Sequence, residues 1–130
     1  MKPSDVQIGE TYKVSHDYSA PTYVIASSKY KNLVETRDAV TGRYGEYKAG
    51  SLSPIGQSDL DEIARRKDRL VRCSAVKNFL VGLGLNARVT TSKTRTFDIR
   101  IDSGAVPLEH LEEKVLAIMA RLEGTGTVPS

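Results

Sequence analysis

The hydrophobic pattern of this chain changes its period near residue 57, and this change constrains the fold more than any other feature of the sequence. From Val6 to Ile55, short segments alternate apolar and polar residues between turn sequences, which is the pattern of β-strands. From Ser58 onward, two segments repeat apolar residues every three or four positions, which is the pattern of helices. The sequence therefore predicts an α+β fold with a strand-rich part over residues 1–56, a second part over 57–123 and a flexible tail over 124–130.

Four strands are expected in the first part, followed by one helical turn and a short closing strand. In the first strand, Tyr12, Val14 and His16 share one face, as alternation along a strand requires. Thr41-Gly42 predicts a hairpin turn, because glycine readily adopts a positive φ. The expected strands are Thr11–His16, Thr22–Ser27, Leu33–Ala39 and Tyr44–Lys48, with the helical turn and the closing strand within Ala49–Ile55.

Residues 6–55 resemble small five-stranded barrels of the Src-homology-3-like type. The features that carry the resemblance are Gly9-x-x-Tyr12-x-Val14, Val34-x-x-Arg37-Asp38-x-x-Thr41-Gly42 and Ser51-Leu52-Ser53-Pro54-Ile55. The resemblance implies a small closed β-barrel at the N-terminus. Barrels of this type bind DNA, RNA or peptides, so the resemblance implies an architecture and leaves the activity open.

A long basic helix is expected to begin at Ser58, which suits an N-cap, with Asp61 in its first turn. Apolar residues lie on one side of this helix and arginines on the other. The arginines are Arg65, Arg66, Arg69 and Arg72. Beyond Cys73 the apolar residues move to the side that the arginines occupied. Either the helix breaks near Cys73-Ser74, or one continuous helix packs its two halves against different surfaces.

A β-hairpin is expected after the long helix, which Gly82 and Gly84 predict to end. Its strands are expected over 87–91 and 95–101, about a turn at Ser92-Lys93. One face of the hairpin is apolar, and the other is polar and mostly basic.

A second helix is expected after Pro107, because proline suits a first helical turn and apolar residues then recur at spacings of three and four. These residues are Leu108, Leu111, Val115, Ile118 and Leu122. The second part is thus expected to be a helix, a hairpin and a helix (αββα). A two-stranded sheet is marginally stable unless it packs on helices or pairs with another sheet. We therefore expect a homodimer joined through the 87–101 hairpin.

Positive charge is concentrated between Arg65 and Arg100. The net charge of the chain is only +3, but this window holds ten lysines and arginines against two aspartates. Such a surface attracts phosphates or an acidic protein, and arginine favours forked hydrogen bonds to either. The expected binding residues are Arg65, Arg66, Arg69, Arg72, Arg88, Lys93, Arg95 and Arg100. A solvated helix face balanced by acidic residues elsewhere is the alternative interpretation.

All six tyrosines lie in the first part of the chain, between Tyr12 and Tyr47. Most are expected to fill the core of the barrel, because aromatic side chains supply large buried areas. Tyr18, Tyr30 and Tyr44 flank loops or turns, so they are the candidates for exposed contacts. An exposed tyrosine can stack on a base or anchor a peptide.

Residues typical of catalytic and metal sites are few and scattered. Cys73 is the only cysteine, which excludes a disulfide within the chain, and one cysteine with two distant histidines does not form a standard zinc site. His16 and His110 have no neighbouring partner that suggests a catalytic triad. Gly82-x-Gly84 precedes a strand instead of opening a helix, which favours a helix stop over a nucleotide-binding loop. We therefore expect a non-enzymatic protein without a metal or a cofactor.

Nucleic-acid binding is the function that these features favour. The basic helix and the hairpin are expected to contact DNA or RNA beside the barrel, with an affinity that falls steeply with salt. The alternative is a protein-binding module or inhibitor, in which the arginines meet an acidic protein surface and the exposed tyrosines act as anchors. A third interpretation, a phosphate-ligand enzyme or a nucleotide-sequestering oligomer, needs polar groups that converge across a subunit interface.

The size and the two-part build of the chain resemble those of small accessory proteins of bacteriophages. The resemblance includes proteins that block host defence or retune host regulatory proteins, which implies one form of the protein-binding alternative. The N-terminus lacks the apolar core of a signal peptide, and no stretch is long enough to span a bilayer. We therefore expect a cytoplasmic protein that makes no membrane contact.

Overall fold

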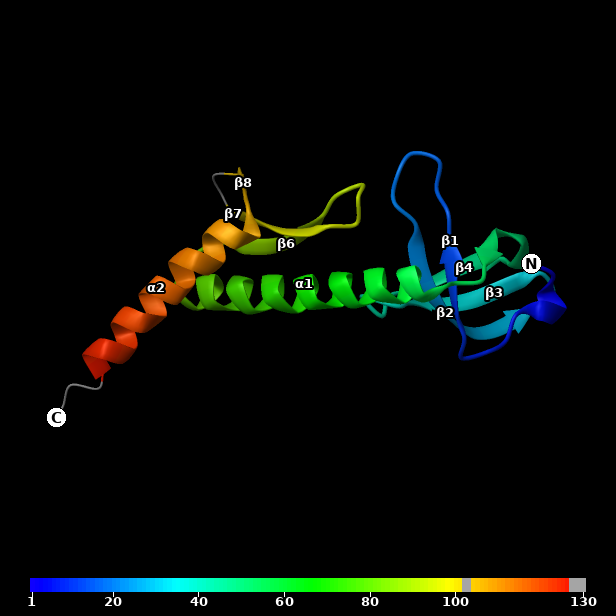
Figure 1. Cartoon of the computed structure of the whole chain (residues 1–130), viewed down its shortest axis with the longest axis horizontal. Coiled ribbons are helices and arrows are strands. Elements are labelled where there is room, and N and C mark those ends of the chain that lie inside the picture. The colour runs from blue at the N-terminus through cyan, green and yellow to red at the C-terminus, as the bar shows by residue number, and fades with distance from the viewer. Residues whose placement is uncertain (102–103, 127–130) are drawn as a thin grey trace. The chain divides into compact units, whose positions relative to one another are not determined.

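The computed structural model describes residues 1–101 and 104–126, which divide into two units. Unit 1 comprises Met1–Leu70 and Lys93–Thr96, and unit 2 comprises Val71–Ser92 and Phe97–Ser130. Helix α1 (Gln57–Gly82) is continuous and contributes residues to both units (Figure 1). The alternative of a break near Cys73-Ser74 is therefore wrong.

Unit 1 is built on an antiparallel sheet with the strand order β4-β3-β2-β1-β5. Its strands are β1 (Thr11–Val14), β2 (Thr22–Tyr30), β3 (Leu33–Asp38), β4 (Tyr44–Lys48) and β5 (Leu52–Ser53). β4 and β5 form the two edges, and within residues 1–101 they do not pair with each other. The expected closed N-terminal barrel is therefore wrong. β5 has only two residues and pairs with β1 alone, through Lys13↔Ser53 and Val14↔Leu52, so it does not reach round to β4.

The order of strands and turns in unit 1 follows the sequence pattern, whereas some boundaries move. The short helix η1 (Pro3–Asp5) precedes β1, and η2 (Ala49–Ser51) leads into β5 as the predicted helical turn and closing strand. Gly42 has a φ of +76°, which the β3–β4 turn requires and a residue with a Cβ rarely adopts. β2 is longer than expected and continues to Tyr30, and its register with β3 shifts between Ala26 and Ser28.

The core of unit 1 forms two clusters, and β2 contributes alternate residues to each of them. Its larger cluster contains Val6, Tyr12, Val14, Val24, Ala26, Val34, Ala49 and Leu52. A smaller cluster contains Tyr23 of β2, Ala39 just after β3, and Ile63 of α1. The partly buried side chains packed against it are Ile25, Val40 and Ile55. Burial of Ile63 therefore holds the first turns of α1 on the sheet.

The first turn of α1 is capped by a different residue from the one expected. The Leu60 N–H donates to the Gly56 carbonyl at 3.2 Å, so Gly56 is the N-cap and the helix begins at Gln57. The Asp59 carboxylate accepts from the Gly56 N–H at 3.0 Å, which is the return bond of a capping box. The expected N-cap at Ser58 is therefore wrong, because Asp59 satisfies the free backbone donor from within the helix.

The last turn of α1 ends in a Schellman motif. The Leu85 N–H donates to the Leu80 carbonyl at 3.1 Å, and the Gly84 N–H donates to the Val81 carbonyl at 3.0 Å. Gly84 has a φ of +85°, the left-handed conformation that this motif requires. These bonds confirm that the glycine pair terminates a helix.

Unit 2 contains a three-stranded antiparallel sheet in the order β6-β7-β8, the second part of α1, and helix α2 (Leu108–Gly126). The strands are β6 (Ala87–Thr91), β7 (Phe97–Ile101) and β8 (Gly104–Val106). The expected αββα order is wrong, because β8 adds a strand beside β7 through Ile99↔Val106 and Ile101↔Gly104. This strand was missed because three residues before a proline carry no readable alternation. The third strand also removes the reason given for a dimer joined through the hairpin.

The buried residues of unit 2 that the structure describes come from α1, β6, β7 and α2. They are Cys73, Val76 and Leu80 of α1, Ala87, Phe97 and Ile99 of the sheet, and Leu108, Leu111 and Val115 of α2. In residues 1–101 and 104–126, neither long helix is apolar enough over a sufficient length to cross a bilayer. Of the expected tail, residues 124–126 form the end of α2, and 127–130 lie outside the described residues.

Candidate functional site

Arg66, one of the expected binding residues of α1, is bound inside unit 1. Its side chain is only 8% exposed, and its Nε lies 3.0 Å from Glu62 Oε1. Its Nη1 donates to the Pro21 carbonyl at 2.7 Å, and its guanidinium lies 4.9 Å from the ring centroid of Tyr23. This arginine therefore joins α1 to the sheet.

The other α1 arginines of the expected set also have partners. Arg65 is exposed and lies 2.6 Å from Glu62 through Nη2. Burial alone raises the pKa of Glu62, but the hydrogen bonds from Arg65 and Arg66 outweigh it and lower that pKa below its usual value. Arg72 binds both carboxylate oxygens of Glu112 on α2, at 2.9 Å through Nε and 2.5 Å through Nη2. Arg69 is half-buried and has an interaction partner of its own.

A polar network at the start of α1 contains residues that sequence reasoning missed. The Tyr23 hydroxyl donates to Asp59 Oδ1 at 2.7 Å, and Lys13 Nζ lies 3.7 Å from the same oxygen. Burial and the bond to Asp59 raise the pKa of Tyr23 to about 12. The Gly56 N–H and the Tyr23 hydroxyl lower the pKa of Asp59. Tyr23 and Asp59 are 36 positions apart, so no local sequence pattern predicts their contact. The network anchors the first turn of α1 on the sheet.

Lys93 and Arg95 lie in the turn between β6 and β7, in residues that belong to unit 1. The Lys93 carbonyl accepts a hydrogen bond from the Ala20 N–H at 2.8 Å. This bond involves only the backbone, and the Lys93 side chain is exposed. Arg95 has a φ of +60°, and its Nε donates to the Ala20 carbonyl at 3.5 Å. The backbone of this turn is therefore held, and Lys93 offers an exposed ammonium group.

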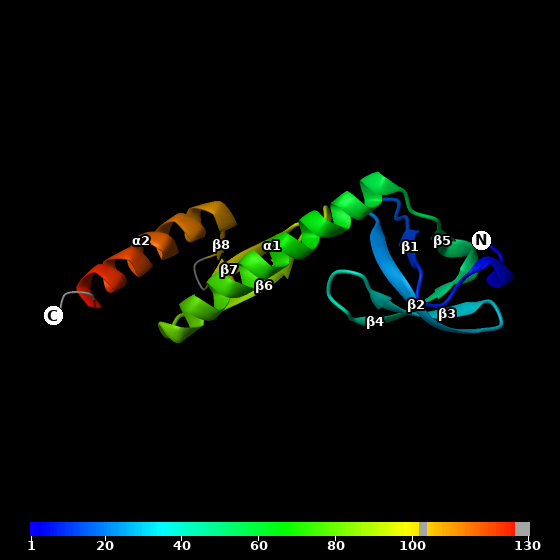
Figure 2. The ribbon, with the colours of Figure 1, turned by 60° about the horizontal axis from the view of Figure 1, so that its bottom comes forward.

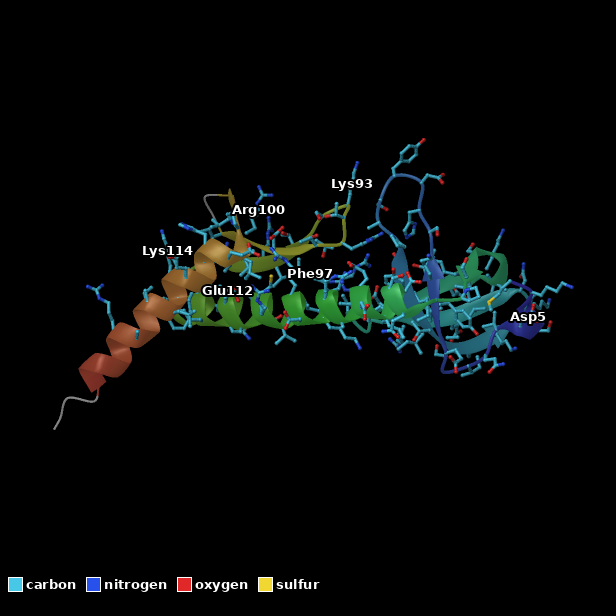
Figure 3. All side chains as sticks on the ribbon, viewed as in Figure 1. Asp5, Lys93, Phe97, Arg100, Glu112 and Lys114 are labelled. Atoms are coloured by element: carbon cyan, nitrogen blue, oxygen red, sulfur yellow. The ribbon has the colours of Figure 1, made fainter. Side chains whose placement is uncertain are left out.

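Arg88 and Arg100 are brought together by the strand register of unit 2. They are directly opposite each other on β6 and β7, and both are exposed. Phe97 and Ile99 are buried from the other side of the sheet, and Figure 3 shows Arg100 and Phe97 on opposite sides. Within residues 1–101 and 104–126, no hydrogen bond or ion pair joins either guanidinium group to another side chain. Like charges directly opposite each other destabilise a sheet, so this pair favours a bound anion.

The three expected contact tyrosines are exposed in three different parts of unit 1. Tyr18, in the loop between β1 and β2, is 90% exposed, while Tyr30 and Tyr44 are 71% and 55% exposed. Lys31 lies over the ring of Tyr30, and Arg37 lies over that of Tyr44. Tyr18 therefore presents the largest free aromatic surface of the three.

Cys73 and His16, whose side chains could take part in chemistry, both contact other residues of the fold. Cys73 is fully buried, and His16 Nε2 lies 2.8 Å from the Thr22 hydroxyl. Among the residues that the structure describes, no cluster of three or more histidine, cysteine or acidic side chains is placed to hold a metal ion.

Comparison with known proteins adds no relative from which a function can be carried over. No family model, no curated protein and no solved structure matches the chain. No relative therefore tests the resemblance of residues 6–55 to Src-homology-3-like proteins, or that of the whole chain to bacteriophage accessory proteins. Both stay predictions, although the sheet in residues 6–55 is open.

Proposed function

We propose that this protein binds nucleic acid without catalysis, through phosphate contacts on the outer face of β6 and β7. The observation that carries the proposal is the opposed, exposed pair Arg88 and Arg100. Opposed residues of an antiparallel pair have Cβ atoms about 4.5 to 5.5 Å apart, so both guanidinium groups can reach one phosphate or two successive ones. A phosphate there replaces the repulsion between the arginines with charge-assisted hydrogen bonds.

The two arginines of this face suit contact with a nucleic-acid backbone. Strands of a β-sheet can lie along a groove of DNA. Between the arginines and the turn, the same face carries Thr90 and Asp98, which are paired with each other in the register. Arginine contacts to phosphate position a protein but read no sequence. We therefore propose a binding mode with weak sequence preference and strong salt dependence.

The test is fluorescence anisotropy of labelled single- and double-stranded DNA and RNA over a series of salt concentrations. Arg88→Gln with Arg100→Gln is compared with Lys48→Gln and Lys67→Gln, two exposed lysines of unit 1 that give the same change in net charge. The arginine variant should lower the slope of log K against log salt by about 1 to 2, because each lost phosphate contact removes about 0.9.

The lysine variant should keep a slope close to that of the wild-type chain. Equal losses in both variants would show that net charge alone attracts the nucleic acid, and would contradict a site at the arginine pair. Absence of binding at the lowest salt concentration would overturn the proposal entirely.

The second candidate function is a protein-binding module or inhibitor, including a phage-encoded blocker of a host defence or regulatory protein. The observation that favours it is Tyr18, whose side chain is 90% exposed at a loop. Tyrosine is among the residues that most often dominate a protein interface. A partner captured by the wild-type chain should be lost with Tyr18→Ala and kept with Tyr30→Ala, the matched change at another exposed tyrosine. Retention of the partner by both variants would contradict this function for Tyr18.

A further inference from the structure

Helix α2 contains a run in which every side chain is apolar. Residues 115–120 read Val-Leu-Ala-Ile-Met-Ala, with Lys114 before the run and Arg121 after it. Six residues cover more than one full turn of about 3.6 residues, so this stretch is apolar on all sides. A helix that is apolar all round is normally buried on all sides.

Among the side chains of this run that the structure describes, unit 2 buries Val115 and leaves others exposed. Leu111 and Val115 are each 7% exposed, whereas Leu116 is 65% and Ile118 is 37% exposed. The C-terminal part of α2 extends past the last turn of α1 in both views (Figures 1 and 2). The core of the unit therefore ends near Val115, while the apolar surface of the helix continues.

The uncovered side of the run has a shape that fits a copy of itself. Leu116 shares one side of the helix with Ala117 and Ala120, since these positions lie within an arc of about 100°. Both alanines are exposed. Two such surfaces are complementary when the helices run antiparallel, because the large Leu116 of each copy lies over the small alanines of the other.

The charges that flank the run select the same arrangement. Glu113 and Arg121 lie four residues before and four residues after Ala117, and both are exposed. Antiparallel pairing about Ala117 places Glu113 of each copy level with Arg121 of the other, so these opposite charges meet at both ends. Lys114 lies about 100° further round the helix than Glu113, away from Leu116 and Ala120. Parallel pairing would place like charges together, which is unfavourable.

From these observations we propose that a second copy of this chain is the partner of α2. The two copies pack antiparallel through Leu116, Ala117 and Ala120, with Glu113 and Arg121 of opposite copies paired at the ends. The interface is two-fold symmetric, so each chain contributes and receives the same contacts. This inference uses unit 2 alone and does not rest on the proposed nucleic-acid function.

The first test measures the mass of the full chain in solution by sedimentation equilibrium over a wide range of concentrations. The wild-type mass should rise from one chain to two as the concentration increases. Leu116→Glu should stay at the mass of one chain, because a charge is then buried against the alanines. Leu60→Glu, at a residue of α1 that is 48% exposed, is the matched control and should dimerise as the wild-type chain does.

The second test separates a direct contact from an effect on folding. Glu113→Arg and Arg121→Glu should each weaken the dimer, because each places like charges at both ends. An equimolar mixture of the two variants should dimerise again, because each mixed pair has opposite charges at both ends. Far-UV circular dichroism should show wild-type helix content for each variant.

Three outcomes would overturn the proposal. A wild-type chain that keeps the mass of one chain at every concentration rules out the dimer. A dimer that persists in Leu116→Glu rules out this surface of α2. A mixture of the charge variants that stays at one-chain mass, while the wild type dimerises, rules out the antiparallel arrangement.

Discussion

The two units differ in the burial and pairing of their polar and apolar side chains. Unit 1 has a five-stranded sheet whose apolar face is buried, and it binds Arg66 to a carboxylate, a carbonyl and a tyrosine ring. Unit 2 has a three-stranded sheet, an opposed arginine pair on its outer face and an apolar helix run that it half covers. Arg66 of unit 1 thus has partners inside its unit, whereas the arginine pair and part of the apolar run of unit 2 are exposed.

Arg66 and Arg100 illustrate the point with one residue type. Arg66 lies on a helix face that Tyr23 and Pro21 cover, so its charge is neutralised by Glu62 and its hydrogen bonds are internal. Arg100 is exposed on β7, directly opposite another arginine. An arginine with internal partners contributes to folding, and one without them is available for binding.

The largest expected effect contrasts a core leucine with an exposed one. Leu52→Ala should destabilise unit 1 by about 2 to 5 kcal/mol, because Leu52 is 1% exposed and its loss leaves a cavity. Leu116→Ala, at low protein concentration, should cost less than about 1 kcal/mol, since the side chain is already in water. Urea unfolding followed by far-UV circular dichroism reports both variants, because both units contain helix and sheet. Similar losses in the two variants would contradict the contrast between the units.

A smaller effect is expected for the arginines that share Glu62. Arg66→Ala should lower the free energy of unfolding by about 2 to 4 kcal/mol, because it leaves buried polar groups without their partner. Arg65→Ala should lower it by less than about 1 kcal/mol, because its ion pair is exposed. The same urea experiment measures both. A loss for Arg66→Ala no larger than that for Arg65→Ala would show that the helix is held on the sheet by other contacts.

The smallest expected effect is a change in the pH dependence of stability. The pKa of Tyr23 rises from 10.0 to about 12 on folding, so the folded state retains a proton that the unfolded state loses first. The corresponding stability is present below pH 10 and is lost as the pH rises toward 12. Tyr23→Phe should therefore differ most from the wild-type chain near neutral pH and least at the alkaline end. A difference that stays constant through this range would contradict the Tyr23–Asp59 bond.

Local patterns in the sequence were sufficient for most of the secondary structure. Alternation located β1 to β4, and Thr41-Gly42 located the turn whose glycine has a φ of +76°. The pattern of threes and fours located α1 and α2 to within a few residues. These features depend on near neighbours in the chain, so they can be read without knowing the fold. The sequence pattern did not predict β8, because its three residues are too few to show a period.

The site was less predictable than the fold, because the state of an arginine depends on what covers it. Helical periodicity correctly places the four arginines of α1 on one helix. It does not predict that their partners include Glu62, Pro21 and Glu112. Alternation placed Arg88 and Arg100 on one face, but only the strand register makes them direct neighbours.

The period of each segment, the turn glycines and the concentration of positive charge can all be read from the amino-acid order. The open first sheet, the contact of Tyr23 with Asp59 and the partners of Arg66 and Arg72 depend on the folded chain. The physical reason is the range of the interactions. Backbone conformation follows from neighbouring residues, whereas burial, ion pairing and hydrogen bonding join residues that only the folded chain brings together.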